Sequence, residues 1–395
     1  MKPSIYKVAA VAAASTIVLA ACGSASNSAA GSSATQSSGA TSGGGASASS
    51  SSSGSYKSLK SLDWANITDA GALQISIQDS IKAASQKLGV NLKLYNNNAD
   101  PTTALRNAQL MLTDHADVVA DFNISITANT AIGNMFLKAN QPCVGVDIQV
   151  PNCVWLQLNN PALGAEAGQK VGDIVKAKGW TGQNTTVIGI TTWATGPFVN
   201  GCVTDFYSSF ARAVPGMIQK SASSFGPNTT RIGSNYIGLD AGLLPQPAFQ
   251  AVQQVLPSIP SSQHLVIVGL NDDVVNAALK AANDAGRSTA NTVAVGLGDG
   301  ASINELRTNP QWVAEDDIFY KGWGEVLLAI ADGLVNGVKP SGPVDIPAAV
   351  VTKANVNKYY GSSGDTAKLL PLPSKDGYLK PLGVLQKFGN FEGLQ

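Results

Sequence analysis

Four of the strands that the sequence predicts end in Asn or Asp: Asn123, Asp147, Asn271 with Asp272, and Asp299. Carboxylates accept hydrogen bonds and amides both accept and donate them, so these groups suit a ligand with vicinal hydroxyls. The alternative for each position is that the side chain only caps the next helix or forms the turn. Because ligands of open α/β sheets bind at the carboxyl ends of the strands, we expect these side chains to surround a common site.

The sequence carries no motif of nucleophilic or phosphate-transfer catalysis. It lacks G-x-S-x-G and G-x-x-x-x-G-K-[ST], and its two His, His115 and His264, fall at a predicted helix end and in a loop before a strand. Adjacent carboxylates such as Asp316 and Asp317 point to opposite faces of a strand, which does not suit glycosidase chemistry. We therefore expect a binding protein rather than an enzyme, with no cofactor and no metal site.

The elements that must position these residues follow from hydrophobic periodicity. The predicted strands are Leu62–Ile67, Val90–Tyr95, Val118–Phe122, Cys143–Val146, Thr186–Ile190, Gly233–Ile237, Leu265–Gly269 and Thr292–Val295. The predicted helices are Ala72–Leu88, Thr102–Asp114, Asn129–Ala139, Leu163–Lys178, Val203–Val214, Pro247–Val255, Val274–Ala285 and Trp323–Val335. This alternation predicts an α/β fold with parallel sheets and crossover helices.

Length and composition set the class of protein. The chain has 395 residues, 44% of them apolar and 13% charged, with 26 Lys and Arg against 26 Asp and Glu. The length favours two lobes over one core, and the absence of net charge disfavours nucleic acid as a partner. The apolar fraction is too high for a disordered chain.

The amino terminus resembles a bacterial lipoprotein signal. Lys2 and Lys7 precede an apolar stretch from Val8 to Ala20, and Leu19-Ala20-Ala21-Cys22-Gly23 resembles a lipobox. This resemblance implies that residues 1–21 are removed and that Cys22 is lipidated, which would anchor the protein to the outer face of the cell membrane. An ordinary signal peptide with an incidental Cys is the alternative. Residues 23–55 contain only Gly, Ser, Ala, Thr, Asn and Gln, and none of them is charged. We therefore interpret residues 22–58, which include the lipidated Cys, as a flexible tether.

Three further Cys remain in what is expected to be an exported chain. Cys143 and Cys153 flank a turn-forming stretch, which favours their pairing. A disulfide between Cys153 and Cys202 is the main alternative. No C-x-x-C occurs, so neither a zinc motif nor a thioredoxin motif is indicated.

The body resembles the type I periplasmic binding proteins, in the ribose- and galactose-binding branch that serves ABC importers. The matching segments are, in the family's order, Leu88-Gly89-Val90, Asn97 to Pro101, Gln141 to Asp147, Leu158-Asn159-Asn160 with Gly164 and Gly168, Gly269 to Asp272 with Ala278-Leu279, Ala285-Gly286-Arg287, Val295-Gly296 with Asp299-Gly300, Ala331 to Leu334 with Gly337, and Pro343-Val344-Asp345. The resemblance implies two Rossmann-like lobes joined by a multi-strand hinge. Lobe one would comprise residues 59–158 and 319–340, and lobe two residues 159–318 and 341–360, followed by an irregular tail at 361–395.

The resemblance also implies a ligand site. Asp147, Asn271 and Asp272 match family ligand contacts, whereas Asn123 and Asp299 need a shift of one residue, with Phe122 and Gly298 as the rival placements. The family has a ligand-binding Gln in the hinge. A gap-free alignment places it at Ile318 and a shift of one residue places it at Asp317, and we choose Asp317 as the candidate ligand contact. Phe198 is a further candidate for the wall of lobe two.

Other positions depart from the family. Leu73 and Gln74 stand where an aromatic pair usually stacks on the sugar, and Trp64 or Trp193 could supply the missing ring, although Trp64 is equally explained as a core residue. Ile148 and Cys202 stand where the family has Arg. Loss of both guanidinium groups predicts a net acidic pocket that favours neutral polyhydroxy ligands or cations.

These observations predict a monomeric, lipid-anchored solute-binding protein that delivers a sugar or polyol to ABC permease subunits. A nucleoside, an autoinducer or a cationic ligand on the same fold remains an alternative, as does a sensor-type binder that feeds a receptor.

Overall fold

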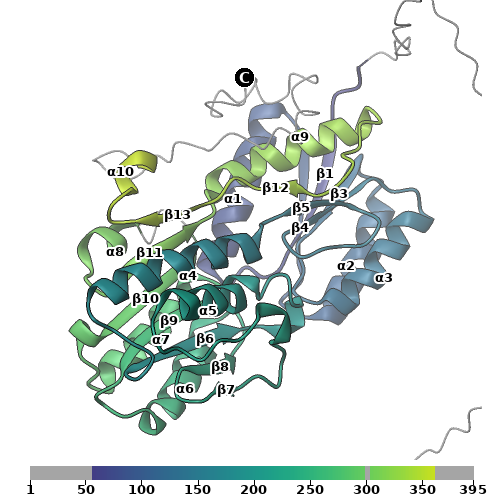
Figure 1. Cartoon of the computed structure of the whole chain (residues 1–395). Helices are drawn as coiled ribbons and strands as arrows, with labels where there is room; N and C mark the ends of the chain where they lie inside the picture. Colours follow the sequence, from purple (N-terminus) through teal and green to yellow (C-terminus); the bar gives the residue numbers. More distant parts are fainter. Residues whose placement is uncertain (1–55, 299–302, 361–395) are drawn as a thin grey trace, which may run out of the picture. The chain divides into compact units, whose positions relative to one another are not determined.

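The computed structural model describes residues 56–298 and 303–360, which build two sheet-bearing lobes (Figure 1). The predictions on Cys22, on the tether up to Ser55, on Asp299 and on the tail from Gly361 lie outside the described residues. Within them, no helix combines the length and the apolar character needed to cross a membrane, and no three His, Cys, Asp or Glu side chains are grouped to hold a metal ion.

The first lobe has a six-stranded parallel sheet. Its order is β12 (Val344–Asp345), β5 (Val154–Gln157), β4 (Cys143–Val146), β3 (Val118–Asp121), β1 (Ser61–Asn66) and β2 (Asn91–Asn96). Helices α1 (Ala72–Leu88) and α9 (Trp323–Val335) pack together, as do α2 (Pro101–Asp114) and α3 (Ile126–Lys138). The two pairs bury different clusters of apolar side chains, so the sheet lies between two cores.

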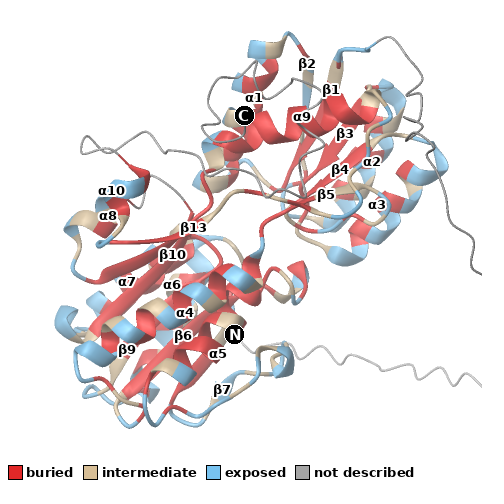
Figure 2. Cartoon of the chain, turned by 45° about the horizontal axis from the view of Figure 1, so that its top comes forward, coloured by how far each residue is buried: buried red, intermediate tan, exposed pale blue. Residues whose placement is uncertain are grey.

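The second lobe has a seven-stranded sheet. Its order is β13 (Ala349–Thr352), β11 (Trp312–Asp317), β10 (Thr292–Gly298), β9 (His264–Gly269), β6 (Thr185–Thr191), β8 (Tyr236–Asp240) and β7 (Arg231–Ile232), and only the two edge strands pair antiparallel. Its helices are α4 (Asn160–Ala177), α5 (Gly201–Ala213), α6 (Pro245–Val255), α7 (Asp272–Asp284), α8 (Ile303–Thr308) and α10 (Val356–Tyr359). Figure 2 shows that the central strands and the helix sides facing them are buried, whereas the edge strand β7 is exposed.

Helices α4 and α5 are held together by a seam of glycines. Gly164 and Gly168 lie one helical turn apart on α4 and face α5. A Cβ at Gly168 would lie 2.2 Å from the carbonyl oxygen of Phe206. Only glycine allows the two backbones to approach this closely, and the seam fixes the position of α4, which begins at Asn160.

The chain passes between the two sheets at three places within the described residues: after β5, after β11 and after β12. The last crossing corrects one expected boundary. Residues 341–345 were assigned to lobe two, but β12 pairs with β5 in the first sheet, with Val344 opposite Leu156. A two-residue strand has no periodicity of its own, so only the pairing partner reveals its lobe.

Most predicted elements are present, with helices that begin up to three residues earlier than periodicity indicates. Polar and Pro residues such as Asn160 and Pro245 start these helices, and they precede the first apolar repeat. The strand predicted from Gly233 instead begins at Tyr236, because Gly233 has a φ of 51° in the turn between β7 and β8. Periodicity also missed β5, β7, β11, β12, β13, α8 and α10, which are two to six residues long.

Candidate functional site

A pocket lies where the carboxyl ends of strands from both sheets come together. Its cavity volume is about 30 Å³, so side chains of the two lobes fill most of the space between them in this structure. Lobe one contributes Ile67, Leu73, Gln74, Ile77, Phe122, Asp147, Ile148 and Trp323. The crossings contribute Leu158 and Ile318, and lobe two contributes Asn160, Thr195, Val199, Leu243, Leu270, Asn271 and Leu297. No Lys or Arg is among these lining residues, so the pocket offers no cationic partner to an anionic ligand.

Asp147 is the only carboxylate among these lining residues, and the backbone around it is tightly held. It follows β4 with a φ of 55°, a left-handed conformation that Asp tolerates better than most side chains. Its backbone N–H donates to the Leu156 carbonyl at 2.7 Å, and its own carbonyl accepts from Trp155 Nε1 at 2.8 Å. These bonds to β5 fix the direction in which the carboxylate points.

The Asp147 carboxylate also contacts the second lobe. Asn160 Nδ2 donates to Asp147 Oδ1 at 3.3 Å. Burial raises the pKa of the Asp147 carboxyl to about 6, while the hydrogen bonds from Asn160 and from the Leu158 backbone act in the opposite direction. The group is therefore ionised at neutral pH and can accept hydrogen bonds from a ligand.

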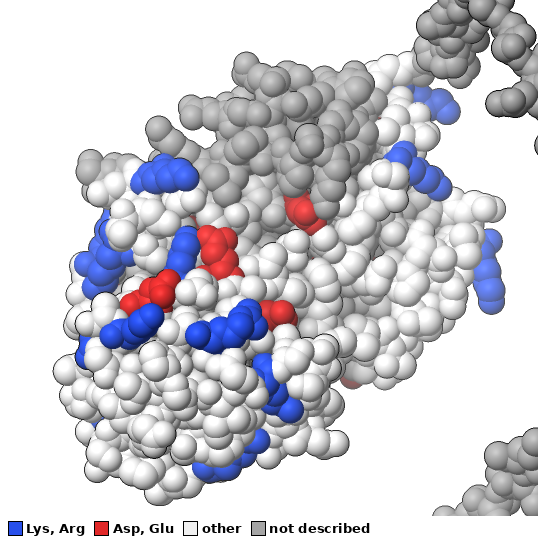
Figure 3. Space-filling model, viewed as in Figure 1, with Lys and Arg blue, Asp and Glu red and all other residues white. Residues whose placement is uncertain are grey.

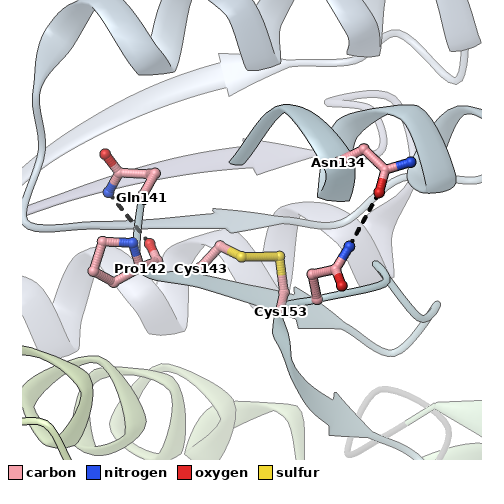
Figure 4. Close-up of a disulfide and its surroundings, with 6 residues drawn as sticks. Asn134, Gln141, Pro142, Cys143 and Cys153 are labelled. Atoms are coloured by element: carbon pink, nitrogen blue, oxygen red, sulfur yellow. Dashed lines mark hydrogen bonds between the residues drawn. A yellow bond between two sulfur atoms is a disulfide. The ribbon is translucent and has the colours of Figure 1, made fainter. Parts of the chain in front are cut away.

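A disulfide closes the loop that carries Asp147. Cys143 and Cys153 are bonded, with their Cα atoms 4.9 Å apart, so the structure has the first of the two pairings considered (Figure 4). Cys202 is a buried free thiol. The bridge joins the start of β4 to the residue before β5, and Asp147 and Ile148 lie between its ends.

Asn271 lines the pocket and also caps a helix. Its Oδ1 accepts the backbone N–H of Val274 at 2.9 Å, which caps α7, and its Nδ2 donates to the Leu243 carbonyl at 3.0 Å. Asn271 therefore lines the pocket and caps a helix at the same time, so the two roles considered for it are compatible. The amide keeps one donor and one acceptor site beyond these bonds.

Asn123 does not line the pocket, which corrects its expected placement. Its side chain is fully buried, donates to Asn129 Oδ1 at 2.8 Å and accepts from the Ser125 N–H at 3.1 Å. The turn between β3 and α3 consumes the amide, and Phe122, the rival placement, lines the pocket instead. Asn129 in turn donates to the Gln149 carbonyl at 3.2 Å, so Asn123 supports the Asp147 loop from behind.

Asp317 and Asp272 also lie outside the pocket lining. Asp317 is fully buried, and its carboxylate accepts hydrogen bonds from the Phe319 N–H at 2.9 Å and from the Tyr360 hydroxyl. Ile318, the position given by the gap-free alignment, lines the pocket instead. Asp272 lies against the backbone of β10: a Cβ at Gly296 would be 2.2 Å from its Oδ1.

A buried carboxyl pair lies in this part of lobe two. Glu315 is hydrogen-bonded to Asp272, and Trp312 Nε1 donates to Glu315 Oε2 at 3.0 Å. Burial, together with the charges of Asp272 and Asp317, raises the pKa of Glu315 well above its usual range. Burial therefore favours one shared proton over two charges in this pair, which packs between β10 and β11.

The predicted aromatic contacts are not in the lining. Trp64 is a fully buried core residue on β1 whose ring centre lies 6.1 Å from that of Phe122, which is the alternative already considered for it. Phe198 instead packs edge-on against Trp155 at 4.9 Å, and this contact joins the lobes beside the pocket. Trp193, whose backbone N–H donates to Asp240, does not line it either.

Three of the departures from the family do face the pocket. Leu73, Gln74 and Ile148 line it, whereas Cys202 lies in the core beneath α4. Sequence reasoning missed Asn160, Thr195 and Trp323 as lining residues. The segment Leu158-Asn159-Asn160 carried a usable signal, because it crosses between the lobes immediately before a helix.

Solved structures similar to this chain include solute-binding proteins. An ABC transporter solute-binding protein from Mycobacterium smegmatis with bound glycerol has a TM-score of 0.63 and 19% identity, over 79% of this chain and 100% of its own. A Caulobacter myo-inositol binding protein with myo-inositol bound scores 0.62 at 17% identity, over 75% and 95% of the two chains. An Actinobacillus succinogenes ABC transporter periplasmic solute-binding protein with bound D-allose scores 0.62 at 13% identity, over 76% and 100%. No protein-family model and no curated protein matches the sequence. At these identities the likeness concerns the fold, and the chain has the two-lobed fold of these proteins.

Proposed function

We propose that this chain is the solute-binding component of an ABC importer and captures a small, neutral, hydroxylated ligand between its lobes. The observation that carries this proposal is the pocket between the two sheets, which holds a carboxylate from one lobe and an amide from the other and has no basic lining residue. The similar solved proteins bind glycerol, myo-inositol and D-allose, which are ligands of this kind. The role is one of binding and delivery, not of catalysis.

The mechanism follows from the division of the site. A ligand that contacts Asp147 and Asn160 together gains both sets of contacts only when the lobes are closed on it. It therefore shifts the population toward the closed form by its difference in affinity for the two forms. The permease subunits recognise that closed form, and the protein acts as a monomer.

The lipobox-like segment supports a membrane anchor as part of the same proposal. Lipidation of Cys22 and a tether of 33 residues, Gly23 to Ser55, would hold the lobes outside the cell membrane within a root-mean-square span of about 30 Å. Cys22→Ser should move the protein from the membrane fraction to the soluble fraction and abolish incorporation of labelled palmitate. Labelled protein that retains the acyl chain would contradict this part of the proposal.

The ligand proposal is tested by thermal shift of the purified protein against monosaccharides, polyols, nucleosides and polyamines. A ligand at a hundredfold excess over Kd stabilises the native state by about 2.7 kcal/mol. We expect shifts only with sugars or polyols, and loss of the shift in Asp147→Ala with the fold intact. Stabilisation only by nucleosides or amines would replace the ligand class, and no shift with any ligand would contradict the proposal.

A further inference from the structure

Several polar groups of the pocket are bonded to the protein itself. The Thr195 hydroxyl donates to the Thr192 carbonyl at 2.7 Å, and the Asn271 amide bonds backbone groups of lobe two at both ends. Asn160 Nδ2 donates to Asp147 Oδ1 at 3.3 Å and to the Leu158 carbonyl at 3.2 Å. The groups that keep hydrogen-bonding sites for a ligand are the Asp147 carboxylate, the Asn160 Oδ1, the Gln74 amide, and one donor and one acceptor site of Asn271.

The remaining lining of the pocket is apolar on every side. Ile148, Leu158 and Phe122 stand next to Asp147 on the first lobe and the crossing, and Leu243, Leu270 and Leu297 face them from the second lobe. These side chains offer no hydrogen bond. A ligand hydroxyl buried against them gives up its water without a replacement partner, and that loss is unfavourable.

We propose that the ligand is amphipathic, with vicinal hydroxyls along one edge and an apolar remainder, as in deoxysugars and short alkyl diols. This inference rests on the proposed function and narrows it. The hydroxylated edge binds at Asp147 and Asn160, where the ionised carboxylate accepts two hydroxyl hydrogens. The deoxygenated part contacts the leucine and isoleucine walls, which reject a fully hydroxylated analogue by leaving its extra hydroxyl unpaired.

The test compares three pairs of compounds that differ by one hydroxyl, by calorimetric titration of the purified protein. The pairs are D-fucose with D-galactose, L-rhamnose with L-mannose, and propane-1,2-diol with glycerol. In each pair that binds, we expect the deoxygenated member to bind at least about tenfold more tightly. If the fully hydroxylated members bind equally well or better, the inference is overturned while the proposed function stands. If none of the six compounds binds, the inference is overturned, whereas the proposed function falls only if the wider thermal-shift screen also finds no sugar or polyol.

A matched pair of variants on α1 identifies the wall that sets the preference. Leu73 lines the pocket and is only half-buried, so Leu73→Gln should fold and give the extra hydroxyl a partner. We expect this variant to lower the preference for the deoxygenated member at least about fivefold. Ile75→Gln is the control, because Ile75 is 39% exposed and outside the lining. An unchanged preference in Leu73→Gln, or an equal change in both variants, would contradict the assignment of the apolar wall.

Discussion

Asn160 Nδ2 donates to Asp147 Oδ1 at 3.3 Å, and this hydrogen bond joins the first residue of α4 in one lobe to the residue that follows β4 in the other. The two side chains lie at the pocket and on either side of the crossing after β5. A single ligand hydroxyl inserted between them would contact both lobes at once. The pair therefore links ligand binding to the relative position of the lobes.

Asp147→Asn should weaken ligand binding and stabilise the free protein in alkaline solution. Burial raises the pKa of this carboxyl from 3.8 to about 6, so the native state binds more protons than the unfolded state between these values. The stability that Asp147 contributes is present at low pH and is lost as the pH rises through 6. Since Asn cannot ionise, the variant should exceed the wild type by up to about 3 kcal/mol at pH 8 and by much less at pH 4. Urea unfolding at both pH values measures this difference, and a difference independent of pH would contradict it.

Reduction of the disulfide between Cys143 and Cys153 should both destabilise the first lobe and weaken ligand binding. The bridge spans a sequence separation of 10, for which loop entropy predicts a loss of roughly 2 to 3 kcal/mol on its removal. Cys143→Ser with Cys153→Ser should lower the melting temperature and the ligand affinity, because the loop between them carries Asp147. Cys202→Ala is the control for loss of a thiol outside the bridge: it should retain the ligand affinity and the sensitivity of the melting temperature to dithiothreitol. A wild-type melting temperature that is unaffected by dithiothreitol would refute the prediction.

Glu315→Gln and Glu315→Ala should differ sharply in stability. Because the pKa of Glu315 is raised well above its usual range, Gln mimics the protonated form that burial favours and keeps an acceptor for Trp312 Nε1. We expect a change in the free energy of unfolding below about 1 kcal/mol for Gln at pH 7. Ala removes the partner of two buried polar groups and leaves a cavity, at a cost of roughly 2 to 4 kcal/mol. Equal losses in chemical denaturation would show that the carboxyl pair shares no proton.

Gly168→Ala should destabilise the second lobe although Ala favours helices. Helix propensity alone predicts a gain of about 1 kcal/mol, but the new Cβ would lie 2.2 Å from the Phe206 carbonyl oxygen and would force α4 and α5 apart. We expect a net loss of roughly 1 to 3 kcal/mol in urea unfolding, with weaker ligand binding because α4 begins at Asn160. The exposed Gln169 on the same helix provides the control Gln169→Ala, which should change stability by less than about 0.5 kcal/mol. A stabilised Gly168→Ala protein would contradict the packing argument.

The alternation of the longer strands and helices, and the edge of the sheets at which the pocket lies, could be predicted from the sequence alone. Buried parallel strands appear as short apolar runs between amphipathic stretches, and turn residues such as Asn and Asp mark where each strand ends. Asp147 could be placed in the site from these signals, because it follows a strand that the apolar run defines clearly. The edge strands β12 and β13 could not be predicted, because strands of two to four residues are too short to show an apolar periodicity.

Which polar side chains at that edge face the pocket depends on tertiary packing, which the sequence pattern does not reveal. Asn123 and Asp147 both follow a strand, but Asn129 and Ser125 consume the amide of one, while the carboxylate of the other keeps free acceptor sites. Asp317 and Ile318 differ by one position, and the pleat of β11 sends one side chain into the interior and leaves the next at the pocket. Sequence identifies a side chain's hydrogen-bonding groups, whereas the packing of distant segments determines which of those groups the protein itself satisfies.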